Sequence, residues 1–78
     1  MEIKEFIQNF ADQFDEVDVE TLNGETEFRM LDEWSSMMGL AIMAMVDDEY
    51  NVQIKADELR KAETIQDVYD LVNSKLEA

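Results

Sequence analysis

Apolar residues recur at helical spacing at both ends of the chain. Near the start, the apolar positions that share one helix face are Ile3, Phe6, Ile7, Phe10 and Phe14. Near the end, the residues with the same spacing are Ile65, Val68, Val72 and Leu76. Thr64 and Asp67 have the spacing of a capping box at the start of the second pattern. The two patterns predict a first helix over residues 2–15 and a final helix over residues 64–77.

A further helix is predicted in the middle of the chain. Ser35 or Ser36 can cap its start, because a serine side chain accepts a hydrogen bond from the N–H groups of the first turn. The helix runs to about residue 50, and its apolar face comprises Gly39, Ile42, Met43, Val46 and Tyr50. Residues 56–61 predict a short helical turn, with an acidic residue early and two basic residues late.

Residues 16–34 show no sustained period of two or of 3.6 residues. The apolar residues scattered through this segment are Val17, Val19, Leu22, Phe28 and Leu31. Long loops without secondary structure are uncommon in compact domains, and these apolar side chains predict a loop pinned to the core. The expected fold class is therefore all-α, a small four-helix bundle of three longer helices and one short helix, with a long loop between the first and second helices.

Composition restricts both the size of the protein and its partners. The 78 residues predict a single domain over 1–78. Twenty acidic and six basic residues give a net charge of -14, which disfavours nucleic acid and anionic membrane surfaces as partners. The longest uncharged apolar run, Met37 to Val46, is too short for a membrane helix. Acidic residues stand where a signal peptide has basic ones, so we expect a cytoplasmic protein, and we expect a monomer.

The residue types leave little room for catalysis. The chain has no cysteine and no histidine, which removes the thiolate nucleophile, the imidazole base and the usual zinc ligands. An EF-hand needs a glycine at loop position 6, but Gly24 in that role would place Val19 at ligand position 1. We therefore expect no enzyme activity and no dedicated metal site, and any thiol chemistry would come from a cofactor.

One stretch carries a more specific pattern. The segment Leu31-Asp32-Glu33-Trp34-Ser35-Ser36-Met37-Met38-Gly39-Leu40 leads into an apolar helix that ends in Val46-Asp47-Asp48-Glu49-Tyr50-Asn51-Val52. Here the chain resembles the acyl carrier proteins, in which a serine followed by Leu, Ile or Met opens the second helix. The later Lys61-Ala62-Glu63-Thr64-Ile65-Gln66-Asp67-Val68 is similar to that family's entry into its last helix. The resemblance is strongest over residues 28–76.

The resemblance implies that Ser36 carries a covalent 4'-phosphopantetheine arm. Ser35 stands where the family usually has Asp, which keeps a helix cap but removes a negative charge. Ser35 is also a neighbouring candidate for the attachment site, but only Ser36 fits both the following Met37 and the spacing to Tyr50. The positive end of a helix dipole independently favours a phosphodiester at this position. The competing interpretation is that these serines are simply helix caps.

The middle helix has more apolar residues than one core-facing stripe needs. Met37, Ala41 and Met45, together with Ala44, fall toward the side that Asp48 marks as exposed, which predicts a face for partner proteins. The alternative is that the long loop covers them. The acidic residues Asp47, Asp48 and Glu49 complete the predicted partner-binding set.

Two functions remain open at this point. The resemblance implies an acyl carrier that holds acyl groups as thioesters for fatty acid, polyketide or related biosynthesis. Its partners would be a phosphopantetheinyl transferase and acyl-loading and acyl-processing enzymes with basic docking surfaces. The alternative is an acidic, non-enzymatic interaction module that has the carrier fold but no arm.

Overall fold

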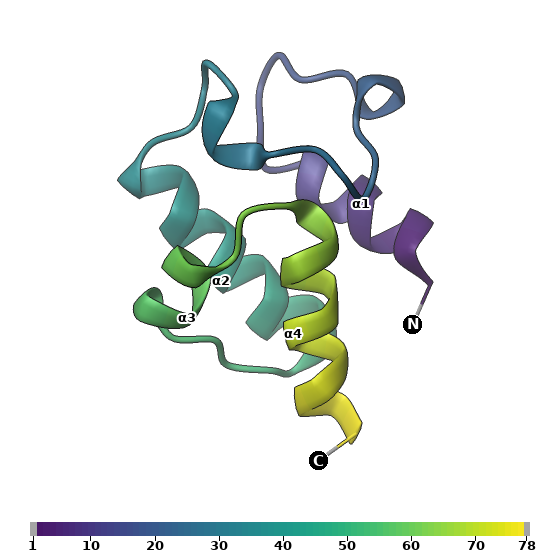
Figure 1. Cartoon of the computed structure of the whole chain (residues 1–78), viewed down its shortest axis with the longest axis vertical. Coiled ribbons are helices and arrows are strands. Elements are labelled where there is room, and N and C mark those ends of the chain that lie inside the picture. Colours follow the sequence, from purple (N-terminus) through teal and green to yellow (C-terminus); the bar gives the residue numbers. More distant parts are fainter. Residues whose placement is uncertain (1, 78) are drawn as a thin grey trace.

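The computed structural model describes residues 2–77, which form helices joined by loops and contain no strand (Figure 1). The four α-helices are α1 (Ile3–Ala11), α2 (Ser36–Tyr50), α3 (Ala56–Lys61) and α4 (Ile65–Glu77). Two single 3-10 turns, η1 (Val19–Thr21) and η2 (Phe28–Met30), interrupt the long segment between α1 and α2. The expectation of an all-α bundle with three longer helices and one short helix is confirmed.

Helix α1 is shorter than predicted. It ends at Ala11 rather than at residue 15, and the next N–H groups bond three residues back, from Gln13 to the Phe10 carbonyl and from Phe14 to the Ala11 carbonyl. Such bonds tighten the last turn of a helix. The carboxylate of Glu33 then accepts the N–H groups of Asp15 and Glu16 at 3.1 and 3.0 Å, so these two residues leave the helical path.

Helix α2 begins and ends at well-defined caps. Ser35 has extended backbone angles, and its hydroxyl accepts the Met38 N–H at 3.3 Å, so Ser35 is the N-cap and Ser36 the first helical residue. At the other end, Asn51 adopts a left-handed conformation with φ of 56° and donates its N–H to the Asp47 carbonyl. The cap therefore fixes which serine stands at the start of the helix.

Short polar contacts also define α3 and α4. The Glu58 carboxylate accepts the Lys55 N–H at 2.9 Å at the start of α3. The Asp67 N–H donates to the Thr64 hydroxyl at 3.1 Å, and the Asp67 carboxylate accepts the Thr64 N–H at 3.2 Å. The predicted capping box before α4 and the short helix at 56–61 are both confirmed.

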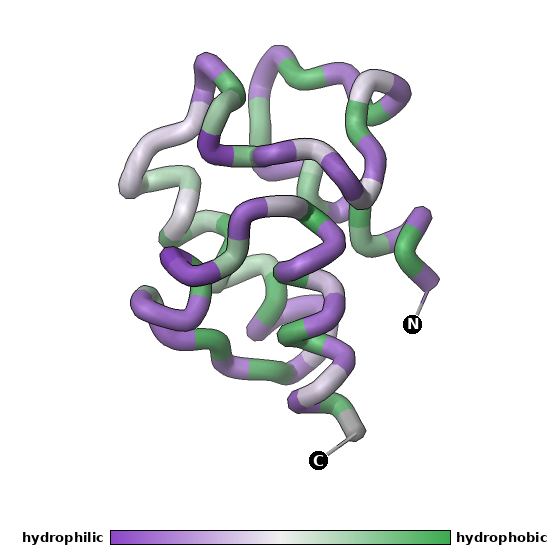
Figure 2. The backbone as a smooth tube through the Cα atoms, in the orientation of Figure 1, coloured by the Kyte–Doolittle hydropathy of each residue, from purple (hydrophilic) through white to green (hydrophobic). Residues whose placement is uncertain are grey.

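The core lies where α1, α2 and α4 converge. Helix α1 packs on α2 and α4, and α2 also packs on α3. Figure 2 shows that hydrophobic residues recur along each of these helices. The side chains that are fully buried are Phe6, Phe10, Phe28, Ile42, Val46, Ile65, Val68 and Val72. Rings from both ends of the chain meet here, since Phe6 lies 5.7 Å from Tyr69 and 5.8 Å from Tyr50 between ring centroids.

The long segment between α1 and α2 is pinned to the rest of the protein. Phe28 is fully buried, and its ring lies 5.6 Å from the Phe10 ring. Two backbone bonds tie the segment to the start of α4, from the Ile65 N–H to the Thr26 carbonyl and from the Gln66 N–H to the Gly24 carbonyl. The sequence predicted an ordered loop held by apolar residues, which is confirmed, and the structure adds the two 3-10 turns.

Candidate functional site

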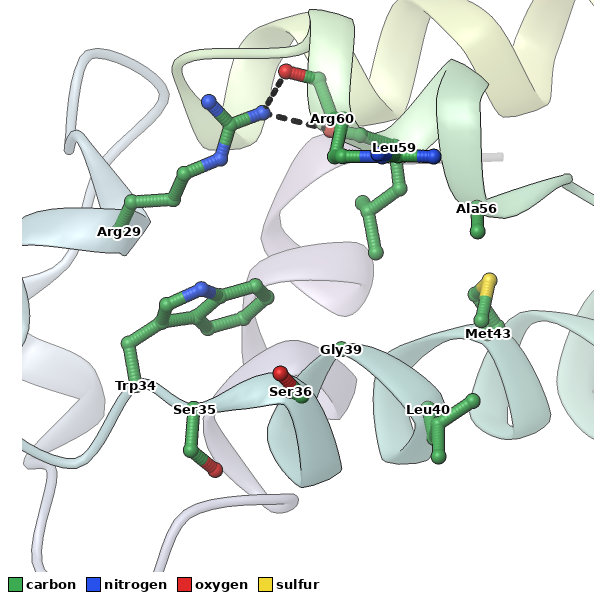
Figure 3. A pocket seen from close by; sticks show the side chains of 10 residues that line it. All are labelled: Arg29, Trp34, Ser35, Ser36, Gly39, Leu40, Met43, Ala56, Leu59 and Arg60. Atoms are coloured by element: carbon green, nitrogen blue, oxygen red, sulfur yellow. Dashed lines mark hydrogen bonds between the residues drawn. The ribbon is translucent and has the colours of Figure 1, made fainter.

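The two serines at the start of α2 have different roles. The Ser35 hydroxyl is engaged as the helix cap, as described above. Ser36 is exposed, and its hydroxyl has no hydrogen-bond partner within residues 2–77. In Figure 3 the Ser35 side chain points away from Trp34, and both serines are among the residues that line a pocket. Ser36 is therefore the serine whose oxygen is available for modification.

The local electrostatics suit a negatively charged group on Ser36. The first N–H groups of an α-helix have no acceptor within the helix, and Ser35 satisfies only that of Met38. The N–H groups of Ser36 and Met37 have no hydrogen-bond acceptor within residues 2–77, and they stand at the positive end of the α2 dipole. A phosphodiester on the Ser36 oxygen would lie beside them, which is a favourable position for an anion.

A pocket of about 640 Å³ opens beside Ser36 between α2 and α3 (Figure 3). Gly39, Leu40 and Met43 from α2 line it, and Ala56 and Leu59 from α3 face them. The remaining lining residues are Arg29, Trp34, Ser35, Ser36 and Arg60. The surface between the two helices is mostly apolar, and the polar groups lie toward the serines and the arginines. The arrangement can shelter an apolar group that is tethered to Ser36.

The wall of the pocket formed by Arg29 and Trp34 comes from the long loop. The Trp34 ring packs edge-on against Phe28 at 4.8 Å between centroids, and Phe28 is fully buried. The Arg29 guanidinium lies over the Phe28 ring and donates hydrogen bonds to carbonyl oxygens of Leu59, Arg60 and Ala62 at the end of α3. The loop is thereby held against α3, which fixes the width of the pocket.

A second pocket of about 400 Å³ continues along the same side of α2. Its lining includes Leu40 and Met43, which also line the first pocket. The other lining residues are Ala44, Asp47, Gln53, Ile54 and Lys55. Leu40 and Met43 therefore line both pockets, the first between α2 and α3 and the second between α2 and the α2–α3 connection.

The predicted partner-binding residues of α2 do not share one surface. Met37 is 77% exposed and Ala41 is partly exposed, but Met45 is only 5% exposed and packs in the core. The prediction that Met45 belongs to a partner-binding surface is wrong, because its side chain is buried. Leu40, which is 62% exposed, lies near Ser36 and was not in the predicted set.

The acidic residues at the end of α2 are exposed but far from Ser36. Asp47, Asp48 and Glu49 all lie on the surface. At 1.5 Å per residue, Asp48 stands about 18 Å along the helix axis from Ser36. Next to them, burial raises the pKa of the Tyr50 hydroxyl, which accepts a hydrogen bond from the Asn9 side chain at 2.8 Å. The serine and this acidic cluster therefore form separate parts of α2.

Two residues that line the pocket, Arg29 and Trp34, were not predicted to do so. Each is held by a residue far away in the sequence, since Arg29 bonds to the Leu59 carbonyl and the Trp34 ring packs near the Phe14 ring. Within residues 2–77, no group of three or more acidic side chains is placed to hold a metal ion. Over the same residues, no helix is both long enough and apolar enough to cross a bilayer.

Comparison of the chain with protein-family models, with curated proteins and with solved structures found no match.

Proposed function

We propose that this protein is an acyl carrier whose 4'-phosphopantetheine arm is attached to Ser36. The observation that carries the proposal is the position of Ser36, an exposed and unpartnered serine at the first position of α2, on the rim of a largely apolar pocket. When bound, this group supplies the thiol on which an acyl group is held as a thioester. The protein itself performs no catalysis in this proposal.

The residues around Ser36 fit such a group. The free N–H groups at the start of α2 favour a phosphodiester on the serine oxygen. Leu59 and Met43 offer apolar surface to an acyl group and would exclude water from it. Ser35 caps the first turn with its own hydroxyl, which leaves the Ser36 oxygen without a hydrogen-bond partner within residues 2–77.

The surface of α2 favours partners whose docking surface combines basic and apolar groups. Met37 and Leu40 expose apolar side chains beside Ser36, and the charge of -14 gives the protein a strong negative field. A field of this sign speeds encounters with basic surfaces, and the exposed apolar side chains add contact area once the surfaces meet. We propose a phosphopantetheinyl transferase and acyl-processing enzymes as partners. The cytoplasmic location and the monomeric state stay predictions.

Modification by a transferase tests the proposal directly. Co-expression with a phosphopantetheinyl transferase should add the mass of one phosphopantetheine group, measured by intact-protein mass spectrometry. Ser36→Ala should abolish the addition, whereas the matched variant Ser35→Ala should keep it. Peptide mapping that finds the arm on Ser35 would move the site by one residue.

The same experiment addresses the alternative of an acidic interaction module. Such a protein would gain no mass with any of several transferases, and protein purified from its own source would also have the unmodified mass. The exposed Met30, Met37 and Leu40 would then be explained as a contact surface alone.

A further inference from the structure

Gly39 is the fourth residue of α2, and the backbone there does not require a glycine. Its N–H donates to the Ser35 carbonyl at 3.1 Å in the normal helical pattern. No glycine within residues 2–77 has a positive φ. Glycine loses more backbone freedom than alanine when a helix forms, so it is the less favourable residue inside one. Gly39 therefore lowers the stability of α2, although the backbone conformation at this position would accept any residue.

Close packing does not require a glycine at this position either. A methyl group on Gly39 would lie 3.6 Å from Leu59 Cδ2 and 3.6 Å from Trp34 Cζ2, which are ordinary van der Waals distances. The other glycine of the chain is more crowded, because a methyl group on Gly24 would lie 2.9 Å from the Gln66 Oε1 atom. Alanine would fit at position 39 without a clash.

The glycine does preserve space in the pocket beside Ser36. Gly39 lines the pocket floor between the Trp34 ring and Leu59 (Figure 3). It follows Ser36 by three residues, and residues at this spacing lie on the same side of a helix. A side chain at position 39 would therefore fill the gap next to the proposed attachment serine, where a tethered group would enter.

On the basis of the proposed function, we propose that Gly39 is a specificity-determining residue that admits an apolar acyl group between Trp34 and Leu59. The lining defines the chemical class of that group. Trp34, Leu59 and Met43 offer apolar surface to the acyl group, and each methylene buried there contributes favourable transfer free energy. An acyl group with a chain of several carbons can bury methylene groups in the gap, whereas an acetyl group is too short to reach it.

The test compares melting temperatures of unmodified, acetyl-loaded and octanoyl-loaded protein. A phosphopantetheinyl transferase and the matching acyl-coenzyme A load the chain, and intact mass verifies each product. The variants are Gly39→Ala and Gly39→Leu. The control is Gly24→Ala, which adds the same methyl group at a residue that does not line the pocket and requires only that the end of the flexible Gln66 side chain move aside. Circular dichroism verifies that each variant keeps its helix content.

In the wild type and in Gly24→Ala, octanoyl loading should raise the melting temperature above that of the acetyl-loaded form. Gly39→Ala should raise the melting temperature of the unmodified protein by about 3 to 6 °C, since it restores helix propensity. The same variant should lose at least half of the octanoyl-dependent increase. Gly39→Leu should lose all of it, because its side chain fills the gap.

Three results would overturn the inference. The first is a lower melting temperature for unmodified Gly39→Ala, which would show that packing needs the glycine. The second is an octanoyl-dependent increase that is absent in the wild type or unchanged in both Gly39 variants, while loading proceeds normally. The third is failure of the wild type to accept any arm, which removes the proposed function and this inference together. Intact mass separates that case from the first two.

Discussion

Arg29 donates a hydrogen bond from its guanidinium to the Leu59 carbonyl at 2.9 Å, across thirty residues of sequence. The same nitrogen also contacts the carbonyl oxygens of Arg60 and Ala62. The last carbonyls of a helix lack donors within it, and the negative end of the dipole favours a cation there. Arg29 therefore caps the end of α3 from outside and holds the long loop against it.

Removal of this contact should destabilise the fold. We expect Arg29→Ala to lower the free energy of unfolding by about 1 to 2 kcal/mol, because charge-assisted hydrogen bonds contribute more than neutral ones even when partly exposed. The matched control is Arg60→Ala. The Arg60 side chain has no hydrogen bond or ion pair within residues 2–77, so its loss should cost about 0.5 kcal/mol or less. Urea denaturation measures both, and equal losses would show that Arg29 acts only as a charge.

The Asp67 carboxylate links the capping of α4 to pH. Backbone N–H groups of Glu63 and Thr64 donate to it at 3.0 and 3.2 Å, and these bonds lower its pKa below the usual value. A carboxyl group with a lower pKa in the folded state stabilises the fold at pH values above its unfolded pKa. That contribution is lost as the pH falls through the lower, folded pKa.

The Asp67→Ala variant isolates this effect from the other acidic residues. Its melting temperature should lie below that of the wild type at pH 6, and the difference should shrink between about pH 5 and pH 3. The comparison cancels the relief of charge repulsion, which both proteins experience as their shared carboxylates are protonated. A difference that stays constant down to pH 3 would show that the cap does not depend on ionisation.

The helices at both ends were predictable because a polar face marks each apolar stripe. In α2 the run from Met37 to Val46 has no charged residue, so the period does not indicate which side is buried. That is why Met45 was placed on the surface, although it is buried, while Leu40 is exposed. A stripe is informative only where polar residues alternate with it.

Contacts between residues distant in sequence lie just beyond the end of α1 and at the pocket, and the local sequence pattern does not predict them. The apolar face of α1 extends to Phe14, which is buried as expected, yet the helix ends at Ala11, and Glu33 accepts the N–H groups of Asp15 and Glu16 that a longer helix would have used. The serine at the start of α2 was identifiable from its neighbours in the sequence. The pocket beside it was not, because Trp34 and Arg29 form its wall through contacts with Phe28 and Leu59.

Ser35 and Ser36 should separate stability from modification. Ser35→Ala removes the side chain that accepts the Met38 N–H, so we expect a loss of about 1 kcal/mol in the free energy of unfolding. Ser36→Ala should change the stability of the unmodified protein by less than half of that, since the Ser36 hydroxyl makes no hydrogen bond within the described residues. Thermal and urea denaturation of the two variants would test this, and a larger loss for Ser36→Ala would contradict the assignment of the cap.

Ser35→Asp provides a further comparison, because aspartate also caps helices and adds a negative charge at the positive end of the dipole. The variant should be at least as stable as the wild type. We also expect a generic phosphopantetheinyl transferase to modify it faster, since the resemblance implies that an acidic residue at this position helps the transferase to dock. An unchanged or lower rate would show that the charge is not needed.

The docking surface on α2 offers two contributions that kinetics can separate. The first is charge. Asp47, Asp48 and Glu49 are exposed at the far end of the helix, where they act mainly on the encounter rate. Reversal of all three to lysine should slow association with a basic transferase and flatten its dependence on salt. The second contribution is apolar contact close to Ser36.

Met37 and Leu40 are the residues that test the apolar contribution. Both are largely exposed, and burial of such a side chain against a partner contributes roughly 1.5 to 3 kcal/mol. Met37→Ala should therefore lower kcat/KM for the transferase by roughly fivefold or more, with the salt dependence unchanged. Leu40→Ala should act in the same direction. Met45→Glu is unsuitable as a probe, because it would bury a carboxylate in the core and unfold the protein.

The measurement is steady-state kinetics of the transferase on each variant at two salt concentrations. Met30→Ala is the matched control, since Met30 is as exposed as Met37 but belongs to the long loop rather than to α2. We expect wild-type kinetics for this control. If Met30→Ala and Met37→Ala slow the enzyme equally, the contact surface extends over the loop. Wild-type kinetics for Met37→Ala, Leu40→Ala and the triple charge reversal would exclude α2 as the docking helix, because neither contribution would then act through it.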